Sequence, residues 1–115
     1  DWNRDGRPDA VITAVDVPAV LLTNTTTGCG HWLVLRLVGT TTHRDAIGTR
    51  VVVSAGGKTW FHQLTAGDGY HASNDRRLLL GLGEHERIEG LVVEWPRGRP
   101  QKFSNVQLLL VSKKL

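Results

Sequence analysis

The sequence predicts an all-β protein, a β-sandwich of short antiparallel strands with a calcium-loop hairpin at its N-terminus. Short runs rich in Val, Leu, Ile and Thr recur at intervals of roughly ten residues, which is typical of sandwiches and barrels. Gly, Pro, Asn and Asp gather between these runs and favour turns. Nowhere does a helical period persist over several turns, so strands are expected throughout.

The composition is that of one small globular domain. The chain has 115 residues, 40% of them hydrophobic and 22% charged, with a net charge of +3. Its basic residues are scattered along the sequence, so no nucleic-acid partner is expected. No apolar run approaches the roughly 20 residues of a membrane helix, so no membrane span is expected. The single cysteine, Cys29, leaves the redox compartment open.

The first nine residues form the one run with a clear chemical purpose. Oxygen-bearing side chains stand at Asp1, Asn3, Asp5 and Asp9, and a glycine follows the third of them. Calcium prefers six to eight oxygen ligands, and ligands at alternate residues let a short loop wrap around one ion. The backbone carbonyl of Arg7 would add a ligand, as the seventh position of an EF-hand does. The sequence therefore predicts a calcium site formed by Asp1, Asn3, Asp5, Arg7 and Asp9.

This loop differs from an EF-hand in how it closes. The twelfth position, where an EF-hand has a bidentate glutamate, is Ile12, so Asp9 must close the site. The apolar run after Asp9 predicts a strand instead of a helix. The alternative interpretation is a metal-free surface turn, since Asn, Asp and Gly favour turns without any ion.

Residues 1–24 are expected to form a unit of their own. Strands are predicted at 10–15 and 19–24, with a turn at 16–18. A two-stranded hairpin is marginal in water and needs further strands or a docking surface. Because the chain begins at Asp1 and contains no methionine, we expect it to be a fragment or a processed chain. The small, polar residues 25–30 are the expected linker.

The second unit, residues 31–115, begins with the strongest strand signal in the chain. Leu33, Leu35 and Leu37 alternate onto one face of the run 31–38. The paired glycines 56–57 predict a hairpin turn. In the loop before it, Asp45 is expected to bond backbone amides, Ile47 to enter the core and Gly48 to adopt a special backbone conformation. Further strands are predicted at 50–54, 59–65, 70–73, 77–82, 87–95, 101–103 and 107–112.

Several short motifs of the second unit are similar to a known family. The N-terminal loop, which runs into a strand, resembles the calcium loop of FG-GAP or VCBS-type repeats over residues 1–24. The second unit contains the runs His31-Trp32-Leu33, Leu37-Val38-Gly39, Arg44-Asp45-Ala46-Ile47-Gly48 with Arg50-Val51, Gly67 to Tyr70 with Ser73, Leu80-Gly81-Leu82-Gly83, and Val93-Glu94-Trp95-Pro96 with Gly98. Through these runs, residues 31–112 resemble the ASPIC/UnbV domain, which follows such repeats in secreted proteins such as the cartilage acidic proteins. His43 and Arg97 depart from the family pattern.

The resemblance implies a function without implying catalytic residues. It suggests a non-enzymatic, calcium-binding module for adhesion or interaction, at the C-terminal end of a longer repeat protein. The implied location is secreted or extracellular, and periplasmic or on the cell surface if the source is bacterial. The implied partners are a protein or a carbohydrate, together with the preceding repeats of the parent chain.

Two other functions are kept as alternatives. An enzyme or a tailoring protein of a natural-product pathway could use His62, His71 and Asp68, provided that one pocket gathers all three. A lectin-like module could stack sugars on Trp60 or Tyr70 if either ring is exposed beside polar groups.

Overall fold

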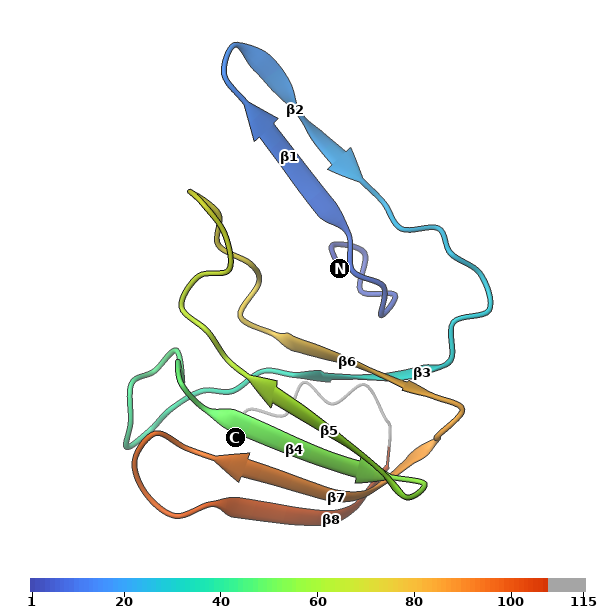
Figure 1. Cartoon of the computed structure of the whole chain (residues 1–115), viewed down its shortest axis with the longest axis vertical. Helices are drawn as coiled ribbons and strands as arrows, with labels where there is room; N and C mark the ends of the chain where they lie inside the picture. The colour runs from blue at the N-terminus through green and yellow to red at the C-terminus, as the bar shows by residue number, and fades with distance from the viewer. Residues whose placement is uncertain (108–115) are drawn as a thin grey trace.

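The computed structural model describes residues 1–107, and this part of the chain is all-β (Figure 1). No helix capable of crossing a bilayer is present among these residues. The strands are β1 (Ala10–Ala14), β2 (Val17–Leu22), β3 (His31–Leu35), β4 (Arg50–Ala55), β5 (Lys58–Gln63), β6 (Leu78–Gly83), β7 (Arg87–Glu94) and β8 (Gln101–Gln107).

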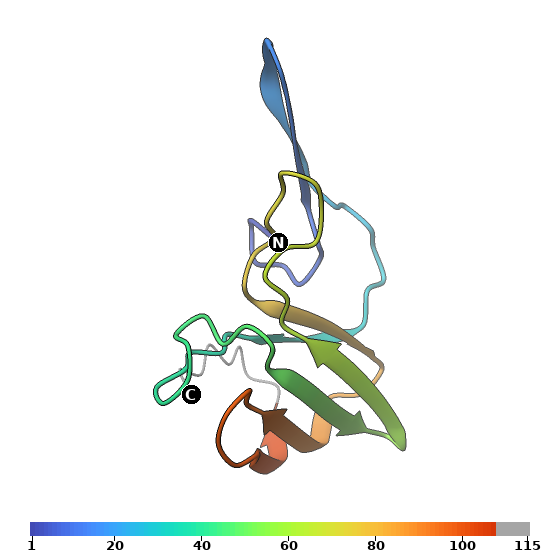
Figure 2. The same cartoon turned by 60° about the vertical axis from the view of Figure 1, so that its left-hand side comes forward.

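Two antiparallel sheets enclose the core. The larger has the strand order β5-β4-β7-β8, and the smaller pairs β3 with β6 (Figures 1 and 2). Buried side chains of both sheets pack between the layers, as predicted for a sandwich. The core residues are Leu33, Leu35, Leu37, Ala46, Val51, Val53, Leu64, Leu80, Leu82, Ile88, Leu91 and Val93.

Alternation along the strands produces this arrangement. In β4, Val51, Val53 and Ala55 are fully buried, while the residues between them are half-buried. In β3, Leu33 and Leu35 face the core and Trp32 stands on the opposite face. Because successive side chains of a strand point to opposite faces, a period of two places one apolar row inside. The predicted alternation of Leu33 and Leu35 is confirmed.

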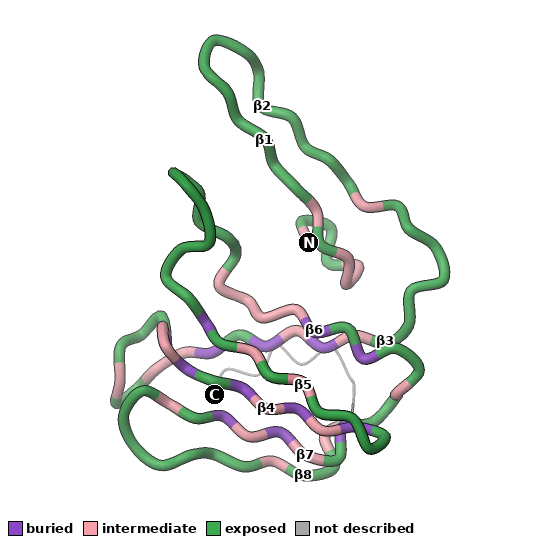
Figure 3. The backbone as a smooth tube through the Cα atoms, in the orientation of Figure 1, coloured by how far each residue is buried: buried purple, intermediate pink, exposed green. Residues whose placement is uncertain are grey.

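The hairpin of β1 and β2 stands apart from the sandwich. It extends away from the smaller sheet in both orientations, and its surface is exposed along both strands (Figures 1 to 3). The two strands pair only with each other among the described residues. Its large apolar side chains are roughly half exposed or more: Val11 67%, Ile12 52%, Val15 86%, Val17 59%, Val20 50%, Leu21 47% and Leu22 50%.

Three predicted element boundaries were wrong. The first hairpin turns at residues 15–16, where Asp16 adopts φ 61°, so Val17 and Pro18 lie within β2. A single bridge between Gly69 and Ala72 replaces the strand predicted at 70–73. Residues 101–107 form one strand instead of the separate strand predicted at 101–103, because pairing with β7 continues along them. The strand predicted at 107–112 lies outside the described residues after Gln107.

The loop before β4 uses different residues from those expected. Ala46, at φ 52°, is the fully buried residue, whereas Ile47 is only half-buried and Asp45 is exposed. Gly48 does adopt a positive φ, of 85°, and its N–H donates to the carbonyl of Leu64 at 2.8 Å. The small alanine fits because the left-handed backbone turns its Cβ into the closely packed core. The prediction for Gly48 is confirmed, and those for Asp45 and Ile47 were wrong.

Candidate metal-binding loop

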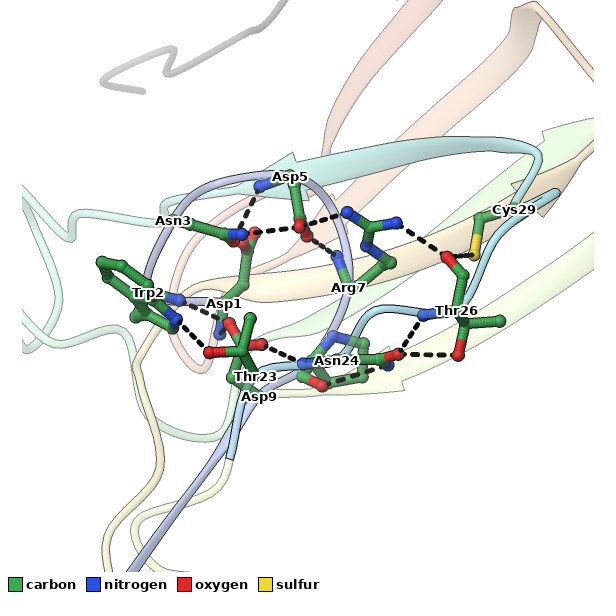
Figure 4. A network of polar contacts seen from close by, with 11 residues as sticks. Asp1, Trp2, Asn3, Asp5, Arg7, Asp9, Thr23, Asn24, Thr26 and Cys29 are labelled. Atoms are coloured by element: carbon green, nitrogen blue, oxygen red, sulfur yellow. Dashed lines mark hydrogen bonds and ion pairs between the residues drawn. The ribbon is translucent and has the colours of Figure 1, made fainter. Parts of the chain in front are cut away.

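The N-terminal loop is shaped by side chains that bond the backbone two residues further on. Asn3 Oδ1 accepts the N–H of Asp5 at 3.3 Å, and Asp5 Oδ1 accepts the N–H of Arg7 at 3.0 Å (Figure 4). Such turns are the local preference of Asn and Asp. Gly6, at φ 84°, takes the left-handed position between them. The alternating polar residues therefore form the turns that curl the chain.

Asp9 fastens this loop to the hairpin. Its Oδ1 accepts the N–H of Asn24 at 2.8 Å, and its Oδ2 accepts the N–H of Trp2 at 2.8 Å. The Asp9 side chain is only 3% exposed. The hydrogen bond from the backbone N–H of Asn24, together with that from the backbone N–H of Trp2, outweighs the effect of desolvation and lowers the pKa of Asp9. Asp9 is thus an ionised, enclosed carboxylate where the loop meets the strands.

Asp5 is held by the guanidinium of Arg7. Arg7 Nη2 lies 2.5 Å from Asp5 Oδ2, which also accepts from Asn3 Nδ2 at 2.7 Å. The Arg7 hydrogen bond is the main reason that the pKa of Asp5 falls to about 2, with further contributions from Asn3 and the Arg7 backbone N–H. The same ion pair raises the pKa of Arg7. Asp5 therefore carries its negative charge at all physiological pH values.

Asp1 contributes an acceptor without a partner. Its side chain is 8% exposed, and its Oδ1 atom is buried with no hydrogen bond among the described residues. A buried carboxylate oxygen without a donor is costly, because it has lost its hydration without replacement. Figure 4 shows Asp1 beside Asn3 and Asp5 within the turn of the loop. A cation placed in the loop would satisfy this oxygen.

The donor set fits calcium in its chemistry, since it consists of hard oxygens from three carboxylates and one amide. In the structure, Asp1, Asn3, Asp5 and Asp9 lie in one short loop. As arranged, however, the described residues hold no group of three or more His, Cys, Asp or Glu side chains that could bind a metal. Asp5 is turned toward Arg7, so an ion in the loop would require Asp5 to exchange that partner.

The loop is docked on the smaller sheet. Gly6 lies so close to the ring of Trp32 that a Cβ at this position would come within 2.2 Å of ring atoms. Arg77, just before β6, donates from Nη2 to the carbonyl of Asp1 at 3.1 Å. These contacts join the loop to both strands of the sheet. Sequence reasoning missed Trp32 and Arg77, because only the folded chain brings positions so far apart in sequence together.

The hairpin and linker provide further anchors for the loop. Trp2 Nε1 donates to Thr23 Oγ1 at 3.0 Å, and Arg7 Nη1 donates to the carbonyl of Thr26 at 2.7 Å (Figure 4). Asn24 accepts the Thr26 N–H at 3.1 Å through its side chain. Asn24 was also missed as a site residue. The sequence placed it at the end of the strand predicted at 19–24, without indicating a contact to Asp9.

The candidate catalytic residues do not form one cluster. His62 and Asp68 both line a hollow of about 230 Å³ between the end of β5 and the start of β6. His71 does not line it, and its ring stacks edge-on against the exposed Tyr70, with ring centres 4.2 Å apart. Asp68 is engaged by the hydroxyl of Thr65 and by Asn74 Nδ2 at 3.0 Å. The pocket that the enzyme hypothesis required therefore contains two of its three residues.

The aromatic residues likewise do not gather into a platform. Trp60 is half-buried against the core and meets His85 edge-on at 6.0 Å. Trp95 also packs against the core, and its Nε1 donates to Gln101 Oε1 at 3.1 Å. Tyr70 is 92% exposed, as the lectin-like alternative requires of either Trp60 or Tyr70. Of the two rings named for sugar stacking, Tyr70 is therefore exposed, whereas Trp60 is half-buried.

Fold and site together define an all-β, two-sheet module with an oxygen-rich loop docked on its smaller sheet. The family model described as "ASPIC and UnbV" matches residues 39–109, more than half of the 115-residue chain. The chain belongs to the ASPIC and UnbV family. Comparison with curated proteins and with solved structures gives no match.

Proposed function

We propose that this chain is a non-enzymatic, calcium-binding interaction module of the extracellular type. It forms the C-terminal part of a longer protein whose preceding repeats are FG-GAP-like, and it acts outside the cell, or in the periplasm or on the cell surface of a bacterium. Its partner is a protein or a carbohydrate. Membership in the ASPIC and UnbV family supports the module, and the N-terminal loop supports the calcium.

The observation that carries the calcium proposal is the state of Asp1. Its side chain is more than nine-tenths buried, and one of its oxygens lacks any donor within the described residues. Asp5 and Asp9 are ionised in the same loop, because hydrogen bonds lower the pKa of both. Arg7 pairs with Asp5, but the buried Asp1 oxygen has no donor in the described part of the chain. A divalent ion liganded by oxygens supplies the missing partner.

The role of the ion in this proposal is structural. Asp1, Asn3, Asp5 and Asp9 bind it through side-chain oxygens and Arg7 through its carbonyl, so the ion cross-links both ends of the loop. Through Asp9 the ion stabilises the base of the hairpin, and through Gly6 it stabilises the contact with Trp32. Calcium thereby sets how the hairpin is held on the sandwich.

The hairpin supports the proposed connection to preceding repeats. Both of its faces carry half-exposed valines and leucines, and each of its strands has one unpaired edge among the described residues. A contiguous apolar surface of this kind marks an interaction site. Further strands of a repeat, paired along an edge of the hairpin, would complete a sheet that two strands alone do not make stable.

Calorimetric titration of metal-stripped protein with calcium tests the proposal. We expect one ion to bind and the melting temperature to rise with calcium concentration, because a ligand of the folded state stabilises that state. Asp5→Asn should greatly weaken binding, since it removes a charge but keeps the acceptor for the Arg7 N–H. Asp45→Asn is the matched control: it removes the charge of an exposed carboxylate far from the loop in sequence and should leave binding unchanged.

Two results would overturn this function. Absence of binding heat and of thermal stabilisation in the wild-type chain would reduce the loop to a hydrogen-bonded turn. Equal binding by the wild type and Asp5→Asn would place the ion elsewhere in the molecule. Terbium, which follows calcium chemistry and is excited through nearby indoles, gives an independent readout because Trp2 and Trp32 adjoin the loop.

A further inference from the structure

The guanidinium of Arg7 occupies the place where a cation would meet Asp5. It lies 2.5 Å from Asp5 Oδ2, and the backbone N–H of the same residue bonds Asp5 Oδ1 at 3.0 Å. One residue therefore engages both oxygens of the carboxylate. The backbone carbonyl of Arg7 is a proposed calcium ligand, whereas its guanidinium competes with the ion for Asp5.

The position of Arg7 over Asp5 leaves part of the guanidinium unsatisfied. Nη2 donates a hydrogen bond to Asp5 and Nη1 donates one to the carbonyl of Thr26, but the buried Nε has no acceptor among the described residues. A buried donor without a partner costs free energy, which partly offsets the ion pair. The half-buried pair is also weakened by the solvent around it. The ion pair therefore holds Asp5 in the metal-free loop but is weak enough for a bound cation to replace it.

We propose that Arg7 is the built-in counter-ion of this loop: it occupies Asp5 in the metal-free protein, and its side chain moves away when a divalent cation binds. This inference rests on the proposed calcium site. Arg7 then sets the affinity of the loop, because each binding event must break the ion pair with Asp5. It also connects the site to the linker, because the same guanidinium binds Thr26 at 2.7 Å.

Arg7→Gln tests the inference directly, since it keeps the backbone carbonyl and removes the competing charge. In calorimetric calcium titrations we expect this variant to bind roughly threefold to tenfold more tightly than the wild type, from the size of partly exposed ion pairs. Arg4→Gln is the matched control. Arg4 lies in the same loop and is exposed, and its side chain bonds no residue of the described part of the chain, so its removal should change affinity by about twofold or less.

A second readout needs no variant. In the metal-free wild type, the ion pair immobilises the Arg7 guanidinium, so its Nε–H signal should be resolved in side-chain nitrogen NMR spectra. Calcium should shift or broaden that signal, while the signal of Arg76, whose Nη1 donates to the carbonyls of Thr65 and Ala66 at 2.9 Å, should remain as an internal reference. An Arg7 signal that calcium leaves unchanged at saturation would overturn the inference.

The outcomes separate the two proposals. Calcium binding by the wild type with equal or weaker binding by Arg7→Gln would overturn the role of Arg7 and leave the calcium site standing. Calcium binding by Arg7→Gln but not by the wild type would support the counter-ion role. It would show that the Arg7–Asp5 ion pair prevents calcium binding in the wild type. Absence of binding in the wild type, Arg4→Gln and Arg7→Gln would overturn both.

Discussion

The hairpin and the sandwich are built from similar residues but are stabilised in different ways. Val51 in β4 is fully buried, whereas Val11 in β1 is 67% exposed, although both lie in short antiparallel strands. The sandwich is held by apolar burial between two sheets. The base of the hairpin is held by hydrogen bonds of Asp9, Trp2 and Asn24 and by the contact of Gly6 with Trp32. The comparison shows that strand-forming sequence does not by itself reveal what a strand packs against.

The largest expected effect comes from shortening matched leucines in the two regions. Leu80→Ala removes a side chain that is 1% exposed and should lower the free energy of unfolding by about 2–5 kcal/mol, because it leaves a cavity in the core. Leu21→Ala, at 47% exposure in β2, should cost about 0.5 kcal/mol or less. Denaturant unfolding measures both values. A cost for Leu21→Ala close to that for Leu80→Ala would show that a buried surface covers the hairpin in solution.

A glycine pair measures how strongly the loop is docked. Gly6→Ala places a Cβ against the ring of Trp32 at a residue with φ 84°, whereas Gly57→Ala has φ 74° with open space around it. In both variants, an alanine in the left-handed backbone region costs about 1–2 kcal/mol of stability. We expect Gly6→Ala to cost about 1 kcal/mol more and to expose the Trp32 indole, because undocking of the loop relieves the clash.

Denaturant unfolding and indole fluorescence follow the glycine pair. The extra cost of Gly6→Ala is limited to the free energy of docking, since the loop can separate while the sandwich stays folded. Equal costs with unchanged Trp32 fluorescence would mean that the loop is not held on the smaller sheet.

The smallest expected effect is the dependence of loop stability on pH. The unfolded carboxyl of aspartate has a pKa of about 3.9, and Arg7 lowers that of Asp5 to about 2. Between these values the unfolded state binds more protons, so stability rises with pH. The contribution of Asp5 is fully present above about pH 4 and is lost as the pH falls through about 2.

The pH prediction is checked by comparing the wild type with Asp5→Asn in denaturant unfolding from pH 2 to pH 6. The difference in unfolding free energy should shrink as the pH falls below about 4, since asparagine does not titrate. A difference that is constant over this range would show that Asp5 contributes no ionised contact to the folded state.

The sandwich could be predicted from sequence because its signals are local. Leu33 and Leu35 alternate, and paired glycines at 56–57 mark a turn, where both residues have positive φ values. The boundaries were less accurate, because pairing with a neighbour decides where a strand ends. Residues 101–107 form one strand along β7, which no local pattern indicates.

The spacing of the oxygen-bearing residues in the loop could be read from the sequence, but the contacts of the loop with the rest of the fold could not. Oxygen residues at alternate positions are visible in the sequence, and the turns of Asn3 and Asp5 follow from that spacing. The partners of the loop depend on tertiary structure, which brings Arg77 to Asp1 and Trp32 to Gly6. The same limit explains Ala46: the sequence suggested that Ile47 enters the core, but the backbone at φ 52° turns the smaller side chain inward.

The exposure of β1 has a consequence for how this chain behaves at high concentration. Residues 10–15, Ala-Val-Ile-Thr-Ala-Val, contain no charge, proline or glycine, and β1, which comprises the first five of them, has one edge that no described strand pairs with. Segments with these properties are the ones that stack into cross-β fibrils. Asp9 and Asp16 flank this segment, and charged residues in such flanking positions oppose stacking. We therefore expect aggregation of this chain to begin at β1, an exposed apolar strand of the hairpin.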